Sequence, residues 1–423
     1  MKKHLDLYVV NGMYWVTAAA FLPFIGAYYT SIGMTDGQVG VLAAVFPLAA
    51  LVIQPFWAYL SDRTGKRKRM LLGLCAASGA AVLLFLRADS FWKCFFAIFL
   101  YAAFSTALLP LCDALVIEAA KKRGADFSRI RMAGTVSYAV AVVLIGTLAG
   151  DSFRWIFLFG GISYAAYFLC CCGLREGADE KIPGCWMEGK SSGYLEAEMP
   201  EDAPRKRKDG TGKASDAPRK RQKAGRTRLF RSSQIFAVLL FAFALQLGLM
   251  YHGTFLGVYL VDLGFDNGMI GVMNCVSALS EVPVLFLINR IRKRVGIMRL
   301  LFLAVVLCAL RLFLVSTGNV VWMLPAQLLQ GPSYMVSYFC CVMYVSENVL
   351  DGRISQGQSL LTMVQTGLGA ICGSLAGGFA AERLGTRGGF LAVGCLILIL
   401  AAAAAVLDRY LRRRREADPA MDV

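Results

Sequence analysis

A few ionisable side chains stand inside long apolar stretches of this sequence, where a charge is costly. Asp113, Glu281 and Arg311 each lie within such a stretch, and Arg131 lies at the beginning of another. A charge at the centre of a membrane helix costs about 2.5–3.5 kcal/mol, so such residues mark functional sites by default. A carboxylate accepts hydrogen bonds and a guanidinium donates them, and together they suit a ligand with several hydroxyl groups.

Asp113 and Arg131 belong to neighbouring apolar runs that are joined by a short connection. The two side chains are therefore expected to approach each other near that connection. Two interpretations stay open: a ligand-binding pair, or a structural ion pair that stabilises a helix bundle.

Glu281 and Arg311 each lie about 13 residues from the start of consecutive apolar runs. At a rise of about 1.5 Å per residue their depths differ by a few ångströms, which a long Arg side chain can close. One interpretation is proton coupling, in which apolar surroundings favour the neutral carboxyl group and the guanidinium resets it. The other is a permanent salt bridge. His252 adds a third polar group, which either binds substrate or protons or makes a helix contact.

The elements that must position these residues are apolar runs of about 20 residues. The chain has 423 residues, of which 57% are hydrophobic and 17% charged, against about 25% charged in soluble domains. Runs of this length cross about 30 Å of hydrocarbon as helices and are too long for barrel strands. The sequence therefore predicts an all-α membrane protein with twelve transmembrane helices: 7–30, 38–60, 70–87, 91–118, 132–150, 153–173, 233–261, 268–289, 298–317, 320–346, 358–380 and 388–411.

The positive charge follows the predicted topology. The net charge is +16, and 38 of the 44 Lys and Arg residues fall on one side of the twelve spans. Loops on the cytoplasmic side are enriched in Lys and Arg. The sequence thus predicts a multi-pass protein of the cell membrane with both termini in the cytoplasm, and its first run lacks the features of a cleavable signal.

Between the two sets of six runs lies a basic segment, 174–232, with few apolar residues. Its composition predicts a disordered cytoplasmic linker. It repeats the six residues 202–207 at 216–221. On a membrane protein these basic clusters are expected to meet anionic lipid headgroups rather than nucleic acid.

The two sets of runs show an internal duplication. Residues 26–45 align without gaps on 257–276, with seven identities, at Gly26/Gly257, Tyr28/Tyr259, Gly33/Gly264, Gly37/Gly268, Gly40/Gly271, Val41/Val272 and Val45/Val276. Two pseudo-symmetric six-helix bundles are therefore expected, 1–173 and 233–411, followed by a cytoplasmic tail, 412–423. Such repeats suit a transporter whose halves rock around a central site.

The connection after the second run carries the most specific motif, Ser61-Asp62-Arg63-Thr64-Gly65-Lys66-Arg67-Lys68. It resembles the loop signature of the major facilitator superfamily, with Ala58 where that pattern usually begins with Gly. Within the superfamily the chain is similar to the branch of oligosaccharide–proton and nucleoside–proton symporters that includes the lactose permease. The similarity rests on Gln54-Pro55-Phe56, on Pro110 to Asp113 and 127–132, on Ser280-Glu281 and on Arg311.

This resemblance implies a major facilitator fold and assigns roles to single residues. Asp113 and Arg131 match the acidic–Arg pair that binds sugar, and Tyr138 stands where the lactose permease stacks a Trp on the sugar. Because helices 1, 4, 7 and 10 line the cavity of the superfamily, Asn11, Gln246 and Gln330 are further predicted substrate ligands, and an inter-helix hydrogen bond is the other interpretation of each. His252 is a predicted ligand as well, because it stands where the lactose permease has an acidic residue.

The resemblance fails at the expected proton site. Gln330 and Ser333 stand where the lactose permease has a His and the Glu that carries the proton. If this chain couples transport to protons, Glu281 or Asp113 must carry them, with Arg311 as the partner charge.

The signature loop is expected to act in gating. In the superfamily it pairs across helices and stabilises the outward-open state. The residues that match this role are Asp62, Arg63, Gly65 and Arg67, together with Glu118 and Glu347, which end spans 4 and 10 at equivalent places.

Several functional classes find no support in the sequence. The 13 Cys residues have no metal-ligand spacing, and no phosphate-binding loop or nucleophile elbow is present. The chain is therefore predicted to be no enzyme, to need no cofactor or metal beyond a proton gradient, and to work as a monomer.

The predicted function is secondary active transport by alternating access, as proton-coupled import of a sugar, oligosaccharide or nucleoside. One alternative is drug or metabolite efflux, which the lack of a proline in 134–150 disfavours. Another is a membrane sensor or scaffold that transports nothing.

Overall fold

The computed structural model describes residues 4–174, 230, 233–349 and 353–417. These ranges are helical apart from short turns and one isolated bridge between Phe230 and Val349. The predicted linker, 174–232, lies outside the described residues except for 174 and 230, as does the second half of the predicted tail, 418–423, so the domain boundaries stay predictions.

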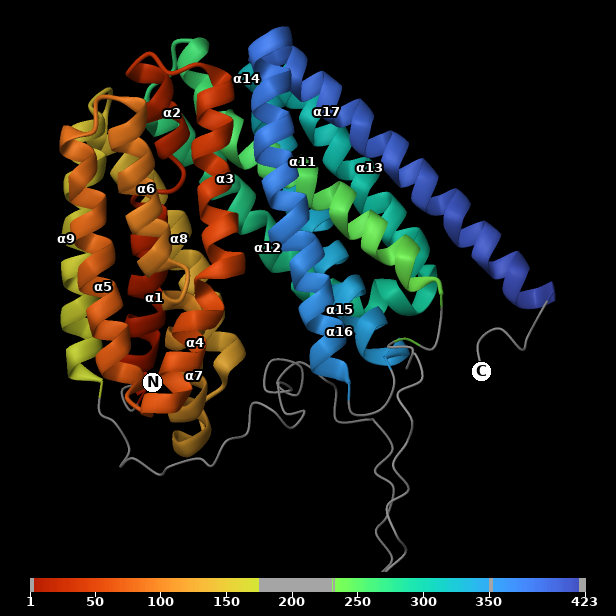
Figure 1. The fold of residues 1–423 in the computed structure, drawn as a ribbon, viewed down its shortest axis with the longest axis horizontal. Helices are drawn as coiled ribbons and strands as arrows, with labels where there is room; N and C mark the ends of the chain where they lie inside the picture. The colour runs from red at the N-terminus through yellow and green to blue at the C-terminus, as the bar shows by residue number, and fades with distance from the viewer. Residues whose placement is uncertain (1–3, 175–229, 231–232, 350–352, 418–423) are drawn as a thin grey trace, which may run out of the picture.

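The helices form two groups that lie side by side (Figure 1). The first group contains α1 (Leu5–Ala19), α2 (Ile25–Ser31), α3 (Asp36–Val52), α4 (Gln54–Thr64), α5 (Arg67–Leu84), the 3-10 turn η2 (Phe85–Arg87), α6 (Phe91–Ser105), α7 (Leu108–Arg123), α8 (Phe127–Ala149) and α9 (Phe153–Gly173).

The second group repeats this order with different interruptions. It contains α11 (Ile235–Asp262), α12 (Asn267–Val295), α13 (Ile297–Ser316), α14 (Val320–Ala326), the 3-10 turn η3 (Gln327–Leu329), the π-helix η4 (Gly331–Met335), α15 (Val336–Asn348), α16 (Ile354–Thr362), the π-helix η5 (Met363–Gly369) and α17 (Ala370–Ala417).

Within the described ranges, nine helices are long and apolar enough to cross a membrane. Two predicted spans do not count among them because each is broken into shorter pieces, the first between α1 and α2 and the tenth at η3 and η4. Predicted spans 11 and 12 correspond to α16, η5 and α17. The backbone of α17 is not helical at Gly385, where φ is 71°, so α17 consists of two helices that meet at this residue (Figure 1).

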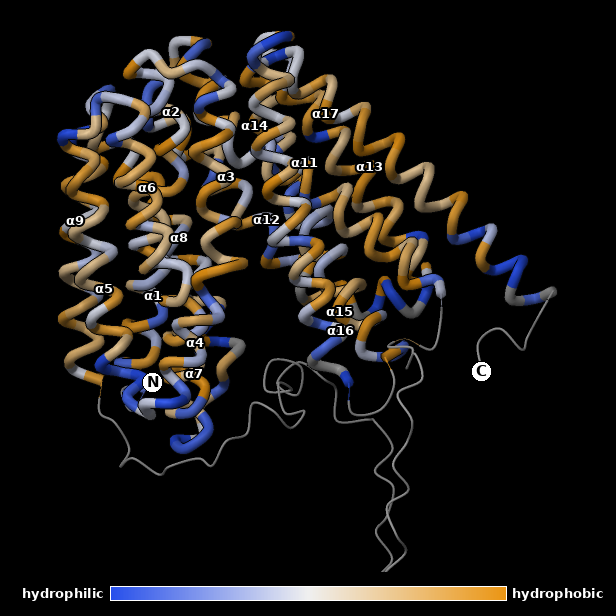
Figure 2. The backbone as a smooth tube through the Cα atoms, viewed as in Figure 1, coloured by the Kyte–Doolittle hydropathy of each residue, from blue (hydrophilic) through white to orange (hydrophobic). Residues whose placement is uncertain are grey.

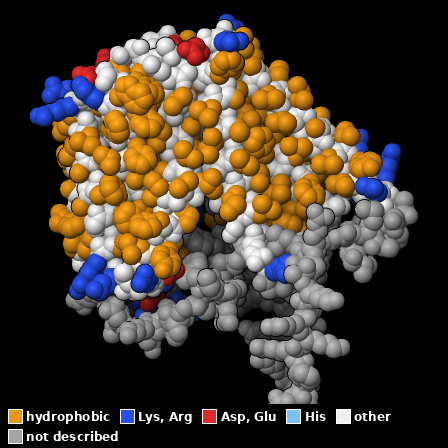
Figure 3. Space-filling model, in the orientation of Figure 1, with side chains coloured by type: hydrophobic (Ala, Val, Ile, Leu, Met, Phe, Trp, Pro, Cys, Tyr) orange, Lys and Arg blue, Asp and Glu red, His pale blue; other side chains and the backbone are white. Residues whose placement is uncertain are grey.

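The outer surface of the helices is apolar. Hydrophobic residues run along the helices in Figure 2, and large side chains such as Phe286 and Trp92 are exposed. Figure 3 shows one flank covered by hydrophobic side chains, with the visible charges towards its edges. A soluble monomer rarely exposes such a continuous apolar surface, so this flank faces lipid.

The identities of the duplicated segment have structural reasons. Gly33 follows α2 and Gly264 follows α11, in turns with φ of 82° and 81°, a conformation that favours glycine. The Tyr28 hydroxyl donates to the Ala88 carbonyl oxygen at 2.6 Å, and the Tyr259 hydroxyl donates to that of Ser316 at 3.2 Å. We call the end with these turns the turn end, and the opposite end, with Arg67, the basic end.

Two repeat-related helix crossings join the groups near the turn end. In the first crossing, between α3 and α17, a Cβ on Gly40 would lie 2.6 Å from the Ser374 carbonyl oxygen. In the second, between α12 and α8, a Cβ on Gly271 would lie 2.5 Å from the Val142 carbonyl oxygen. Glycine at both positions therefore allows backbone-to-backbone contact.

Candidate functional site

The first group places a buried carboxylate beside a more accessible guanidinium. Arg131 Nη1 lies 3.4 Å from Asp113 Oδ2, and the amide of Asn11 donates to Asp113 Oδ1 at 3.4 Å. The Asp113 side chain is 2% exposed, whereas that of Arg131 is 42% exposed. The structure thus brings together three predicted ligands from α7, α8 and α1, with the guanidinium accessible for donation to a ligand.

Trp15 is a member of this cluster that the prediction did not include among the site residues. The Arg131 guanidinium lies over its ring at 5.7 Å, and the Tyr138 ring meets it edge-on at 6.3 Å between centroids. Gly134 leaves the space that the indole occupies, since a Cβ there would collide with it. The sequence signal was available: Trp15 follows Asn11 by four residues, and Gly134 follows Arg131 by three, so each pair shares a helix face.

The second group buries a guanidinium among neutral partners. Arg311 is 2% exposed and donates to Ser277 Oγ at 2.9 Å, to Gln327 Oε1 at 2.6 Å and to Gln330 Oε1. Gln330 in turn donates through Nε2 to Glu281 Oε1 at 3.4 Å.

The direct Glu281–Arg311 contact expected from their depths is therefore wrong. In the described part of the chain no ion pair joins them, because the Gln330 amide stands between the two charges. Depth alone could not reveal this, since the register of a third helix decides what fills the gap.

The π-helix η4 fixes Gln330 in this place. The N–H of Gly331 donates to Ser280 Oγ at 2.9 Å, and a Cβ on Gly331 would collide with the Ser280 carbonyl. A single extra residue in a helical turn rotates the side chains that precede it, and such turns are frequent at functional sites. The local irregularity thus presents the Gln330 amide to both Arg311 and Glu281.

The two clusters face each other between the helix groups. Arg131 and Tyr138 of the first cluster lie on α8, and Glu281 of the second cluster lies on α12. The helices that carry them, α8 and α12, pack together at the second crossing. One site therefore draws its polar groups from both halves of the molecule.

Two predicted ligands lie at the margin of these clusters. His252 is 5% exposed, its ring lies 6.2 Å from that of Phe390, and its helix, α11, packs against α13, which carries Arg311. Gln246 is partly exposed and packs against Gly369 of η5. His252 therefore borders the Arg311 cluster, whereas Gln246 supplies a packing contact.

The basic end carries ion pairs in both groups. Arg67 lies 3.5 Å from both Asp62 and Glu118, and Arg292 lies 2.7 Å from Glu347. Gly65 ends α4 with φ of 66°.

Two other signature residues differ from this pattern. Arg63 is exposed and makes no ion pair among the described residues. Lys68 donates to the carbonyl oxygens of Cys172 at 3.1 Å and Leu174 at 2.7 Å, and so caps the end of α9.

The fold and this central polar site are those of a multi-span solute carrier, and comparison with known proteins agrees. The family model described as "MFS_1 like family" matches residues 4–392, so the chain belongs to this family. The crystal structure of nucleoside transporter NupG has the same fold, with a TM-score of 0.72 at 16% identity over 98% of this chain and 99% of that one.

Relatives include proteins with different named substrates. The maltose permease of Geobacillus stearothermophilus is 24% identical over 90% of both chains. Multidrug resistance protein MdtG of Enterobacter lignolyticus is 24% identical over 97% of this chain and 93% of its own.

Proposed function

We propose that this protein is a secondary active transporter that imports a neutral, hydroxylated solute, a sugar, oligosaccharide or nucleoside, together with protons. The observation that carries this proposal is the Asp113–Arg131 pair, in which the carboxylate is buried and the guanidinium is accessible. Hydroxyl groups both donate and accept, so a polyol ligand can satisfy both members of the pair.

The two members of the pair have different roles in the proposed binding. Asp113 holds Arg131 and Asn11 in place, and Arg131 donates outwards to the solute. The rings of Trp15 and Tyr138, which meet beside the pair, offer an apolar surface to a sugar or base. The site performs no covalent chemistry in this scheme, and alternating access moves the solute.

Glu281 is the better proton carrier in this scheme. Asp113 lies beside the Arg131 guanidinium, which stabilises its charged form. Glu281 instead accepts a hydrogen bond from the Gln330 amide, which carries no charge. Protonation of Glu281 would remove the negative charge nearest to the Arg311 cluster. The protonation state of Glu281 would in this way change the electrostatics of the second helix group.

We further propose that the basic end faces the cytoplasm, because the loops there hold most of the Lys and Arg residues. The protein then acts as a monomer in the cell membrane, with anionic lipids near the segment 174–232.

Efflux of apolar compounds is the second candidate, and the similarity to MdtG favours it. The central site favours import of polar solutes, because an apolar compound would desolvate the Asp113–Arg131 pair without replacing its hydrogen bonds.

The test is uptake by purified protein in liposomes whose interior is alkaline. We expect accumulation of at least one radiolabelled solute from a panel of maltooligosaccharides and nucleosides, and its loss when a protonophore is added. A Glu281→Gln variant should lose accumulation and keep exchange down a gradient.

Two outcomes would contradict the proposal. Failure of the whole panel, with gradient-driven transport of apolar cations instead, would establish efflux. Full accumulation by Glu281→Gln would move the proton site elsewhere.

A further inference from the structure

The ring of Trp15 is fixed in one place by the packing of α1 against α8. A Cβ on Gly134 would collide with the indole, so this glycine leaves the space that the ring fills. The rings of Tyr14 and Tyr138 meet the indole edge-on, at 5.5 Å and 6.3 Å between centroids. The indole N–H is buried and has no hydrogen-bond partner among the described residues. Packing, and not a hydrogen bond through Nε1, therefore sets the position of the ring.

The guanidinium of Arg131 has both this ring and a carboxylate beside it. It lies 5.7 Å from the centre of the Trp15 ring, within the range of cation–π attraction. Its Nη1 atom lies 3.4 Å from Asp113 Oδ2, whereas a tight charge-assisted hydrogen bond measures about 2.7–2.9 Å. The contact with the carboxylate is therefore loose, and the Arg131 side chain remains 42% exposed.

Helix α1 contacts both members of the pair. Asn11 donates to Asp113 Oδ1 at 3.4 Å, and Trp15, four residues later, lies against Arg131. Residues four apart share a helix face. One face of α1 thus meets the carboxylate through an amide and the guanidinium through an aromatic ring. The four residues belong to the first helix group, so these contacts do not depend on where the second group lies.

We propose that Trp15 is a positioning residue that holds the Arg131 guanidinium away from full contact with Asp113 and so keeps it available to the solute. This role rests on the proposed function, because it belongs to the site for a hydroxylated solute. Without the attraction of the ring face, Arg131 would close onto the buried carboxylate, since opposite charges attract more strongly at shorter distance in apolar surroundings. A guanidinium in such a tight pair has fewer N–H groups left for a ligand.

The test weakens the attraction and keeps the shape of the ring. Fluorine atoms on an indole withdraw negative charge from the ring face, which is the source of cation–π attraction, and change the ring size little. Tryptophan with one to four fluorine atoms is placed at position 15 of the full-length chain, which is then purified in detergent. A Trp15 that only filled space would not respond to the number of fluorine atoms.

The first readout needs no solute. Phenylglyoxal modifies arginine side chains and reacts slowly with a guanidinium that a carboxylate holds in its charged form. Peptide mass spectrometry follows the modification of Arg131. We expect the rate to fall stepwise with each fluorine atom, by about three- to tenfold with four, because Arg131 closes onto Asp113. In an Asp113→Asn background the rate should not depend on fluorine.

The second readout is solute binding. The KM of the solute identified in the uptake screen should rise by about the same three- to tenfold, whereas the maximal rate of exchange should stay the same. Trp15→Phe, which keeps an aromatic face, should retain more affinity than Trp15→Leu, which does not.

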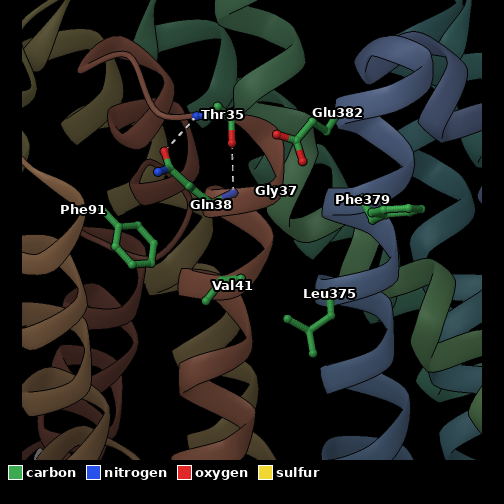
Figure 4. Close-up of a pocket in the computed structure, with 8 residues that line it drawn as sticks. All are labelled: Thr35, Gly37, Gln38, Val41, Phe91, Leu375, Phe379 and Glu382. Atoms are coloured by element: carbon green, nitrogen blue, oxygen red, sulfur yellow. Dashed lines mark hydrogen bonds between the residues drawn. The ribbon is translucent and has the colours of Figure 1, made fainter.

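A second cation–π contact supplies the matched control. The Arg383 guanidinium lies 4.3 Å from the centre of the Phe379 ring. Phe379 lines a groove between α3 and α17, outside the central site (Figure 4). Fluorinated phenylalanine at position 379 weakens a contact of the same kind, and we expect it to change neither the modification of Arg131 nor the KM.

Three outcomes would overturn the proposal. An unchanged modification rate across the fluorine series would show that Arg131 keeps its position without the ring attraction. A faster rate would show that the ring shields Arg131 and does not hold it away from Asp113. A slower rate with an unchanged KM would show that this position has no effect on binding. Failure of the whole solute panel would contradict the proposed function alone, because the modification rate still decides whether Trp15 positions Arg131.

Discussion

The two halves of this molecule keep the same crossings at the turn end but have different centres. In the first half a buried carboxylate holds an accessible guanidinium, at Asp113 and Arg131. In the second half a buried guanidinium, Arg311, is surrounded by the amides of Gln327 and Gln330. The difference teaches that both halves have kept the glycine crossings at the turn end, whereas their central polar residues have diverged.

The largest expected effect is at Arg131. Arg131→Ala removes the guanidinium that faces the buried Asp113 carboxylate, and loss of one member of such a pair costs about 2–5 kcal/mol. Solute binding should weaken by more than about 30-fold, as measured by isothermal titration with the solute identified in the uptake screen. Arg131→Lys keeps the charge and should recover part of the affinity. Wild-type affinity in the Ala variant would assign the pair to structure alone.

The second-largest effect is expected at the glycines of the two crossings, which control closure of the turn end and not solute binding at the centre. Gly271→Val places a side chain against the Val142 carbonyl, and overpacking of this kind costs about 1–3 kcal/mol. The closed turn end should become less populated, so a cysteine introduced at Asn274 should react faster with a membrane-impermeant maleimide. The repeat-related change Gly40→Val should act the same way. A response of only one variant would show that the crossings are not equivalent.

A smaller effect is expected at the link between the two charges of the second half. Gln330→Leu removes the amide between Arg311 and Glu281 and leaves polar groups unsatisfied, at about 1–3 kcal/mol. Proton-driven accumulation should fall about tenfold or more, while exchange without a gradient persists. Gln330→Asn, which keeps an amide on the same helix, is the control and should retain more accumulation than Gln330→Leu. Unchanged accumulation in Gln330→Leu would remove the amide from the coupling path.

The smallest effect compares the two crossings directly. Asn267→Ala loses one hydrogen bond to Gly150, worth about 0.5–1.5 kcal/mol. Asp36 aligns with Asn267 in the duplicated segment and lies near the carboxylates of Asp262 and Glu382, so Asp36→Asn replaces a repelling charge at the first crossing with the residue found at the second. Thermal unfolding in detergent should show a lower Tm for Asn267→Ala and a higher Tm for Asp36→Asn. A lower Tm for both would contradict the repulsion at Asp36.

The sequence was sufficient for the parts of this molecule that depend on periodic patterns. Runs of apolar residues predicted the helical membrane fold, and the duplicated segment marked the glycines of both crossings. The proximity of Asp113 and Arg131 followed from the short connection between their helices, and the structure shows the two side chains in contact.

Other features depend on three-dimensional register, which a single sequence does not reveal. The π-helix η4 decides that Gln330 stands between Glu281 and Arg311, and no local propensity announces an extra residue in a turn. The break between α1 and α2 is a different case, because it contains Pro23, which interrupts a helix and is visible in the sequence. Trp15 was left out of the predicted site residues although the spacing of Asn11 and Trp15 was available, because its contact with Arg131 also requires the small residue Gly134 on another helix.

The contact of Lys68 with Cys172 and Leu174 has a mechanical consequence. The chain leaves the first helix group at Leu174, and that departure point is fastened to the signature loop by a side chain of α5. A force applied to the polypeptide beyond this point would therefore act first on α5 and its neighbouring loop, and not on α9 alone. A force on the chain after Leu174 would therefore be transmitted through Lys68 to the loop whose residues Asp62 and Arg67 take part in the ion pairs with Arg67 and Glu118.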